Sequence, residues 1–142
     1  MKITVCGSIK FAKDLVDIYY KLEKLGHKPK IHKQMFGLAN GTASQLRDMA
    51  NGVENSKIKR KHNFIKWWHD SIKGSDAILA CNFDKNGMKN YIGGNTLMEI
   101  GFAYVNNKKI FLLNPLPEDV SYRDEIKAMV EIVINGDLNK IK

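Results

Sequence analysis

Apolar residues recur along this chain with two periods, one typical of strands and the other typical of amphipathic helices. The strand pattern is found in Met1–Cys6, Lys30–His32, Asp76–Phe83, Lys109–Leu113 and Glu131–Ile134. Helical spacing is found in Lys10–Leu25, Ser56–Lys73, Asn95–Asn106 and Ser121–Met129. Met35–Asn55 is undecided, because it is rich in glycine and asparagine and predicts at most a short helix over Thr42–Ala50.

Strands that alternate with helices predict an α/β fold whose parallel sheet is covered by helices on both faces. Five strands suit a flavodoxin-like or Rossmann-like, doubly wound sheet of order 2-1-3-4-5, in which the winding reverses between the first and third strands. We expect a single domain over residues 1–142, which is long enough for one core. Ligands bind such sheets at the strands' carboxyl ends beside the reversal, so the segments after the first and third strands are expected to share a site.

The loop after the first strand carries Gly7-Ser8-Ile9-Lys10. Free backbone N–H groups at a helix start, the Ser8 hydroxyl and the Lys10 ammonium can together bind a small phosphate group. In the alternative interpretation, Ser8 only caps the helix and Lys10 is solvated. Both interpretations stay open at this point. The loop is not a Walker phosphate loop, since the required glycine spacing and Gly-Lys-Ser/Thr are missing.

The segment Tyr91–Ala103 follows the third strand and opens a helix. Gly93 and Gly94 allow the backbone to approach a ligand closely. Glu99 is expected in the first helical turn, where the helix dipole keeps a carboxylate ionised. Such a carboxylate can act as a nucleophile beside a sugar. The alternative is a capping box, in which Glu99 bonds back to the backbone of Thr96.

The net charge of the chain narrows the classes of ligand that the site is expected to bind. The formal net charge is +8 and the isoelectric point is near 9.5, which favours anions such as nucleotides, nucleic acid or acidic surfaces. We find no apolar run long enough to span a membrane and no signal-peptide pattern. Cys6 and Cys81 are expected as buried core residues, and a reducing cytoplasm is the default compartment. No metal-ligand spacing links the histidines, which are His27, His32, His62 and His69.

A basic run over Lys57–His62 is followed by Trp67 and Trp68. Basic residues with interleaved aromatic residues can bind nucleic acid. Such a run is more often the solvated face of a helix, with Trp68 anchored in the core. We therefore rank nucleic-acid binding below a small-molecule site.

Taken together, these pieces resemble the nucleoside 2-deoxyribosyltransferase superfamily, which includes the 2′-deoxynucleoside 5′-monophosphate N-glycosidases. The matching segments, in order along nearly the whole chain, are Val5–Ile9, Ser75–Ile78, Glu99–Ala103 and, more weakly, Ala128-Met129. The Glu-Ile-Gly-Phe-Ala sequence after a glycine loop is the more specific match. The Cys-Gly-Ser sequence is specific only in combination with the others.

The resemblance implies cleavage of the N-glycosidic bond of a nucleoside or nucleotide, with Glu99 as the nucleophile at the anomeric carbon. A close carboxylate stabilises the positive charge that builds on the sugar, as in retaining glycoside hydrolysis. The resemblance also implies that Ser8 and Lys10 hold a 5′-phosphate, and that no metal or organic cofactor is needed. A homodimer or higher oligomer is expected, in which residues near Lys127–Met129 complete a neighbouring subunit's pocket.

The chain departs from the family pattern at three positions. Thr4 stands where the family has a tyrosine, Trp68 falls where it has an aspartate, and Gly93 stands where some members have a further acid. Candidate substitutes are Asp70, Asp84, Tyr91 and Asn95. We therefore take Glu99 and Asp70 as the candidate catalytic residues. The candidate substrate-binding residues are Cys6, Gly7, Ser8, Lys10, Tyr91, Gly93, Gly94, Asn95, Thr96, Lys127 and Met129.

Other functions stay open beside this one. Gly93-Gly94-Asn95-Thr96-x-x-Glu99 partly matches the cytokinin-type nucleotide phosphoribohydrolases, although a leading proline and one glycine are missing. Both families act on the same class of bond. A nucleotide-binding sensor without turnover is the second hypothesis, since Thr4 and Trp68 occupy positions where catalytic groups are expected.

Overall fold

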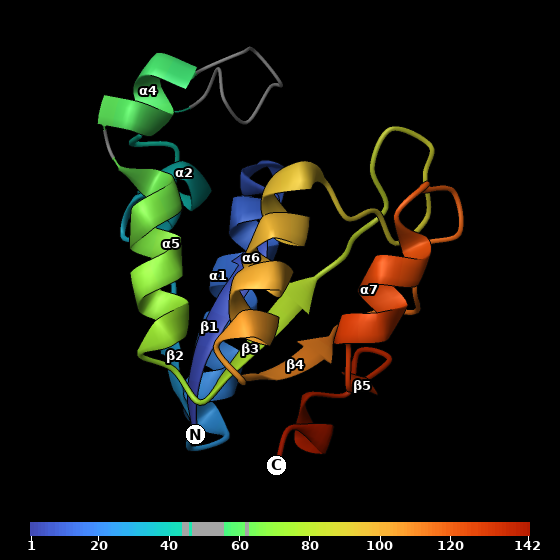
Figure 1. Cartoon of the computed structure of the whole chain (residues 1–142). Helices are drawn as coiled ribbons and strands as arrows, with labels where there is room; N and C mark the ends of the chain where they lie inside the picture. Colours follow the sequence, from blue (N-terminus) through green and yellow to red (C-terminus); the bar gives the residue numbers. More distant parts are fainter. Residues whose placement is uncertain (44–45, 47–55, 62) are drawn as a thin grey trace.

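A computed structural model of the protein describes residues 1–43, 46, 56–61 and 63–142. Its five strands form one parallel sheet in the order β2-β1-β3-β4-β5. The predicted α/β class and the predicted strand order are therefore confirmed (Figure 1). The strands are β1 (Lys2–Gly7), β2 (Lys28–Lys30), β3 (Ala77–Cys81), β4 (Lys109–Leu112) and β5 (Ile132–Val133).

The central strand of the sheet is β3, which pairs with β1 on one side and with β4 on the other. Every residue of β3 is buried, as expected for a strand covered on both faces. Cys6 lies opposite Ala80 and Gly7 opposite Cys81, so the two strands end at the same edge. Their following loops consequently leave the sheet side by side, at the point where the winding reverses.

Helices cover both faces of the sheet (Figure 1). α1 (Ala12–Lys24) follows the short turn η1 (Ile9–Phe11) and packs on β1, β2 and α2 (Gln34–Ala39). α5 (Phe64–Lys73) and α6 (Gly94–Val105) pack against each other and on β1, and α7 (Arg123–Met129) packs beside α6. A short turn, η3 (Leu138–Lys140), lies near the C-terminus. The reversed winding places α1 on the face opposite α6, as the strand order requires.

The single helix predicted over Ser56–Lys73 is wrong. The structure has two helices there, α4 (Ser56–Lys61) and α5, separated at Asn63. Asn63 has a φ of 53°, in the left-handed region that ends a regular helix, and asparagine tolerates it better than most residues do. The apolar period alone did not reveal this break.

All of α2 except its first residue, Gln34, lies in the segment Met35–Asn55, whose sequence was undecided. Its residue Met35 joins the core. The short helix predicted over Thr42–Ala50 falls largely outside the described residues. α2 is brief and has no strong apolar period, which explains why its sequence pattern does not predict it.

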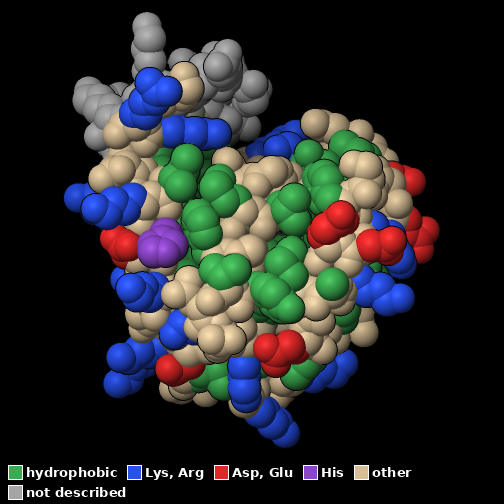
Figure 2. Space-filling view, in the orientation of Figure 1, with side chains coloured by type: hydrophobic (Ala, Val, Ile, Leu, Met, Phe, Trp, Pro, Cys, Tyr) green, Lys and Arg blue, Asp and Glu red, His purple; other side chains and the backbone are tan. Residues whose placement is uncertain are grey.

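Charged side chains are unevenly placed on the surface shown in Figure 2. Lys and Arg side chains predominate over α4 and α5, acidic side chains gather among basic ones towards α7, and apolar side chains lie between the two regions. Tyr104 and Val105 of α6 are 55% and 73% exposed. Among the described helices, none combines the length and the apolar character that a membrane crossing requires.

Candidate active site

A cleft of about 510 Å³ opens at the carboxyl ends of β1 and β3. It is lined by Gly7 and Ser8 from the loop after β1, and by Gly93 and Glu99 from the start of α6. The structure therefore brings together the two segments that the winding reversal predicted to meet. Other lining residues from the predicted set are Tyr91, Gly94, Asn95 and Thr96.

Glu99 is a buried acid with one unsatisfied oxygen. The residue is 5% exposed and lines the cleft, and its Oε2 has no hydrogen-bond partner among the described residues. Burial raises the pKa of Glu99 to about 8, while a hydrogen bond with the Cys6 thiol works in the opposite direction. An unpaired carboxyl oxygen in an apolar setting is costly in either protonation state, and functional sites are where such groups are retained.

The expected position of Glu99 in the first turn of its helix is wrong. α6 begins at Gly94 with Gly93 as its N-cap, so Glu99 is the sixth helical residue and lies in the second turn. The macrodipole acts mainly on the first turn, and burial dominates the pKa instead. The alternative capping box is wrong as well, because Thr96 is not the N-cap and Gly93 has no side chain with which to cap.

A lysine that sequence reasoning missed lies beside Ser8. The Lys85 Nζ donates a hydrogen bond to the Ser8 Oγ over 3.2 Å and lies 5.7 Å from the centre of the Tyr91 ring. All three side chains line the cleft. Lys85 belongs to the polar loop after β3, and its position at the winding reversal was the signal that could have identified it.

Lys10, by contrast, does not line the cleft that holds Ser8 and Glu99. Its side chain is exposed and borders a separate, smaller depression with Ile9, Lys13 and Asp14. The Lys10 charge nevertheless acts on Lys85, whose pKa it lowers together with the larger effect of partial burial. The cation in contact with Ser8 is therefore Lys85, and Lys10 contributes to the local field.

Apolar and aromatic side chains also border the cleft. Trp68 of α5 is 7% exposed and reaches the cleft, in the position where the family resemblance predicts an aspartate. His32 and Lys59 line the cleft too. The remaining apolar lining comes from Ile9, Met35, Leu38, Leu46, Phe64, Ile65, Met98 and Phe102. Such a surface suits a planar, weakly polar group such as a nucleobase.

Several candidate residues lie outside the cleft. Asp70 is exposed, and its Oδ1 lies 2.9 Å from the His69 Nδ1. Cys6 is fully buried in β1. Lys127 is exposed and Met129 half-buried on α7. Within the described chain, neither borders the cleft, and their predicted role in a neighbouring subunit's pocket stays a prediction.

Thr4 does not substitute for the family's tyrosine, because its side chain faces the core. The residue is fully buried, and its Oγ1 lies 2.8 Å from the Ser75 Oγ, which in turn donates to the Ser71 carbonyl. This chain of hydrogen bonds links β1 to α5 beneath the sheet surface. Thr4 is therefore structural in this protein.

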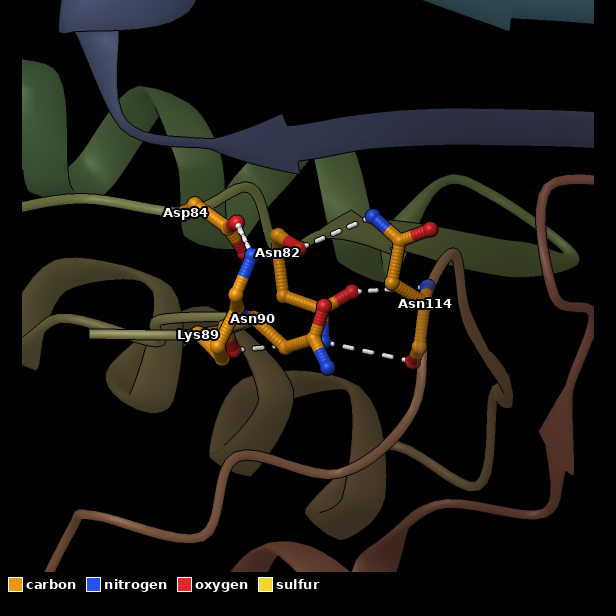
Figure 3. Close-up of polar contacts among 5 residues, drawn as sticks. All are labelled: Asn82, Asp84, Lys89, Asn90 and Asn114. Carbon is orange, nitrogen blue, oxygen red and sulfur yellow. Dashed lines mark hydrogen bonds and ion pairs between the residues drawn. The ribbon is translucent and has the colours of Figure 1, made fainter. Parts of the chain in front are cut away.

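A pair of asparagines anchors the loop that carries Lys85 (Figure 3). Asn82 is fully buried, and its amide nitrogen donates to the carbonyls of Asn90 and Pro115. The Asn82 Oδ1 accepts from the Asn114 backbone, and the Asn114 side chain donates back to the Asn82 carbonyl. These bonds tie the loop after β3 to the end of β4.

The rim of the same loop has its own polar contacts. Asp84 accepts from the Asn90 backbone over 2.9 Å and forms an ion pair with Lys89 over 2.6 Å (Figure 3). Tyr122 donates a hydrogen bond to the Ile92 carbonyl from the segment before α7. The loop therefore presents Lys85 and Tyr91 from a fixed backbone.

No group of three or more His, Cys, Asp and Glu residues in the described part of the chain is arranged to hold a metal ion. The basic run Lys57–His62 lies partly outside the described residues, since His62 is not described. Its remaining residues belong to α4, and Lys59 reaches the cleft.

Comparisons of the sequence with family models and with curated proteins find no match. The fold, however, is similar to that of a solved structure, the CMP N-glycosidase BcmB of Clostridium botulinum. The two chains are 16% identical, the alignment covers 95% of this chain and 88% of that chain, and the TM-score is 0.56. At this identity the similarity establishes the shared fold.

Proposed function

We propose that this protein cleaves the N-glycosidic bond of a nucleoside or a nucleoside 5′-monophosphate, with Glu99 as the nucleophile. The observation that carries the proposal is the Glu99 carboxyl, whose Oε2 has no hydrogen-bond partner among the described residues and which lines the same cleft as Ser8. A buried acid that meets no cation among the described side chains is poorly explained by stability. The shared fold with a CMP N-glycosidase supports the same class of reaction.

The proposed reaction follows from the position of Glu99. The ionised carboxylate attacks the anomeric carbon while the bond to the base breaks, and the base leaves with the bonding electrons and takes a proton from water. A second water molecule, or a second base in a transferase, then attacks the anomeric carbon and loses a proton to solvent, and the bond to Glu99 breaks, which restores the carboxylate. The low polarity around Glu99 strengthens its attraction to the positive charge on the sugar. The apolar lining beside Trp68 is where we place the base.

The experiment that tests this function measures base release from a panel of nucleosides and nucleoside 5′-monophosphates. Glu99→Gln and Glu99→Ala are expected to reduce turnover by at least about a hundredfold, since each removes the nucleophile. Glu131→Gln, which alters an exposed glutamate, is the matched control and is expected to keep full activity. Unchanged turnover in both Glu99 variants excludes this mechanism.

A second candidate function, nucleotide binding without turnover, is favoured by one specific observation. With a pKa of about 8, Glu99 is mostly protonated at neutral pH, and a protonated carboxyl is not a nucleophile. Thr4 and Trp68 also replace groups that the resemblance associates with catalysis. Thermal stabilisation by nucleotides in the absence of any base release, at pH 7 and at pH 9, would support this function instead.

We also propose that the protein forms a homodimer through α6. Tyr104 and Val105 of α6 expose apolar surface. Figure 2 shows apolar side chains between the region over α4 and α5, where Lys and Arg predominate, and the region towards α7, where acidic side chains gather among basic ones. A two-fold axis through α6 places the Lys- and Arg-rich region of one copy over the acidic side chains near α7 of the other. The neighbouring α7, with Lys127 and Met129, then lies close to the second copy.

A further inference from the structure

The edge strand β2 meets α5 through contacts with an aromatic ring. The Lys30 Nζ lies 5.5 Å from the centre of the Trp67 ring, and the His32 ring meets Trp67 edge-on with the ring centres 4.6 Å apart. Trp67 is half-buried, so part of its surface is open to solvent. On the other flank of α5, His69 contacts Phe102 of α6. The β2 side of α5 is therefore separate from the α6 face through which we propose the dimer.

Exposed lysines gather on the β2 side from segments that are far apart in the sequence. We call this surface the basic strip, and it comprises Lys28 and Lys30 of β2, Lys33 before α2 and Lys66 of α5. Figure 1 shows β2, α2 and α5 on the same side of the molecule. The basic run over Lys57–His62, which the sequence pattern singled out, is not part of the strip.

The elements that carry the strip have almost no acidic residues. β2, α2 and α5 together contribute one carboxylate, Asp70, whose Oδ1 lies 2.9 Å from the His69 Nδ1. Among the described residues, no carboxylate forms an ion pair with a lysine of the strip. Elsewhere on the surface, Lys21 and Lys89 each have an acidic partner. Positive charges without counter-charges repel one another, and a bound polyanion relieves that repulsion.

The chemistry of the strip favours a nucleic acid over a membrane. Lysine side chains bind phosphates whatever the base sequence, and an aromatic ring among them can stack on an unpaired base. The contact of an ammonium with a ring is weak at an exposed site, so Lys30 can turn to a phosphate and leave Trp67 to a base. A membrane surface requires apolar side chains that enter the lipid. Among the described residues of these elements, the exposed large apolar side chain is Ile65, which borders the cleft instead.

We propose that the basic strip binds the sugar-phosphate backbone of single-stranded nucleic acid. This is a second binding function, and it does not depend on bond cleavage in the cleft. Lys30 and Lys66 belong to the two elements that meet at Trp67, and they contact phosphates on the strand. Trp67 stacks on an unpaired base, which is why the strip prefers a single strand to a duplex.

The test measures the binding of a fluorescent oligothymidylate of about 15 nucleotides by fluorescence anisotropy. The protein carries Glu99→Gln, so that base release cannot alter the probe. The test variant adds Lys30→Met and Lys66→Met, which preserve most of the side-chain length and remove two charges. The control instead adds Lys109→Met and Lys140→Met, which remove two charges from exposed positions on β4 and η3.

The expected affinity of the intact strip falls steeply with salt. If about four phosphates are neutralised, the slope of log K against log salt concentration is about −3, and the test variant reduces its magnitude by about 1.4. At about 50 mM salt, the dissociation constant of the test variant is expected to be at least about tenfold higher. The control is expected to change it by less than about threefold.

Equal losses in the two variants show that net charge alone matters, and they overturn the inference, as does the absence of oligothymidylate binding at low salt. Tighter binding of a duplex of the same length, of polyglutamate or of vesicles that contain phosphatidylserine assigns the strip to another partner and also overturns it. An excess of a nucleoside 5′-monophosphate is expected to leave oligothymidylate bound, and full competition refutes the strip by placing the strand in the cleft. None of these readouts uses base release, so the strip and the N-glycosidase succeed or fail separately.

Discussion

Glu99 shows how burial decides the chemistry of a single residue. The helix dipole was expected to keep this carboxyl ionised, yet the pKa is about 8 because desolvation outweighs the hydrogen bond with Cys6. A buried carboxyl has a pKa above its usual value when no cation or set of backbone N–H groups compensates for the lost water. The reactive form of Glu99 is therefore the minor one at neutral pH.

The first prediction concerns the pH dependence of base release. If ionised Glu99 is the nucleophile, kcat/KM rises with pH up to an inflection near pH 8, because that constant reports the free enzyme's ionisations. Cys6→Ala removes a hydrogen bond that favours the ionised form of Glu99, so the inflection of this variant is expected at higher pH. Cys6→Ser keeps a hydrogen-bond donor at this position and should bring the inflection back towards pH 8. A flat profile between pH 6 and 9 would argue against Glu99 as the attacking group.

The second prediction concerns stability. The pKa of Glu99 is 4.5 in the unfolded chain and about 8 in the folded protein, so between these two pH values the folded protein keeps a proton that the unfolded chain has lost. The unfolding free energy of the wild type therefore falls as pH rises through this window and levels off above it. The slope is about 1.4 kcal/mol per pH unit at most. Glu99→Gln has no carboxyl to ionise, so its unfolding free energy does not fall in this way. The difference in unfolding free energy between the variant and the wild type should therefore grow in favour of the variant from pH 5 to pH 8. Urea unfolding at several pH values measures it, and a constant difference contradicts the assigned burial.

The third prediction separates Asp70 from the catalytic machinery. Asp70 is exposed and lies against His69, outside the cleft. Asp70→Asn is therefore expected to change kcat/KM by less than about twofold. Asp70 was a candidate only because Trp68 stands where the family has an aspartate and Asp70 is a nearby acidic residue. A loss comparable to that of Glu99→Gln would show that another subunit or another conformation brings Asp70 to the substrate.

At the scale of the elements, the loop between β3 and α6 depends on one buried amide. Asn82→Ala removes donors to the carbonyls of Asn90 and Pro115 and an acceptor for the Asn114 backbone. We predict a loss of about 2–4 kcal/mol in unfolding free energy, because buried partners are left unsatisfied. Protease cleavage within the loop should rise more steeply than global unfolding.

The control for this prediction is Asn139→Ala. Asn139 is exposed, and its hydrogen bonds reach only Asp137. The unfolding free energy of Asn139→Ala is expected to differ from that of the wild type by less than about 1 kcal/mol. If Asn82→Ala behaves in the same way, the loop is held by other contacts, and the fixed position of Lys85 loses its main support.

The elements themselves were predictable where an apolar period is long and clear. β1, β3, β4 and α6 lie within about two residues of their expected bounds, because buried strands and an amphipathic helix show their burial directly in the sequence. The break at Asn63 was not predictable from period, since both halves keep the same apolar stripe. α2 was missed because it is too brief to show a period.

The site was predictable only as far as topology determines it. The winding reversal predicted that Ser8 and Glu99 share a cleft, and the structure brings them together. Lys85 and Ser8 are far apart in the sequence, and the geometry of two loops brings them into contact. No local sequence pattern predicts such a contact. The pKa of Glu99 likewise depends on what surrounds it in three dimensions.

At the scale of the whole molecule, the net charge of +8 is distributed unevenly. Basic side chains predominate over α4 and α5, whereas acidic side chains gather among basic ones towards α7, with apolar side chains between the two regions (Figure 2). In the proposed dimer, a two-fold rotation brings the first region of one copy opposite the second region of the other. The positive charge at Lys85 and Lys59 lies in the cleft, where it attracts an anionic ligand.

The last prediction tests the self-complementary face. Val105→Lys places a charge on the apolar centre of the proposed interface, and its two symmetry copies repel each other across the axis. Sedimentation equilibrium is expected to show at least a tenfold weaker dimer, about 1.4 kcal/mol. Leu25→Lys, which alters a residue 44% exposed after α1 on the opposite face of the sheet, is the control and should leave the dimer unchanged.

Salt adds an independent readout of the same face. If the basic and acidic sides meet across the axis, the dimer weakens as ionic strength rises, because screening acts on exposed charges. The apolar centre keeps part of the affinity at high salt. If Val105→Lys and Leu25→Lys weaken association equally, or if the wild type is a monomer at every concentration, α6 is not the interface. In that case the dimer through α6 no longer supports the prediction that Lys127 and Met129 complete a neighbouring subunit's pocket.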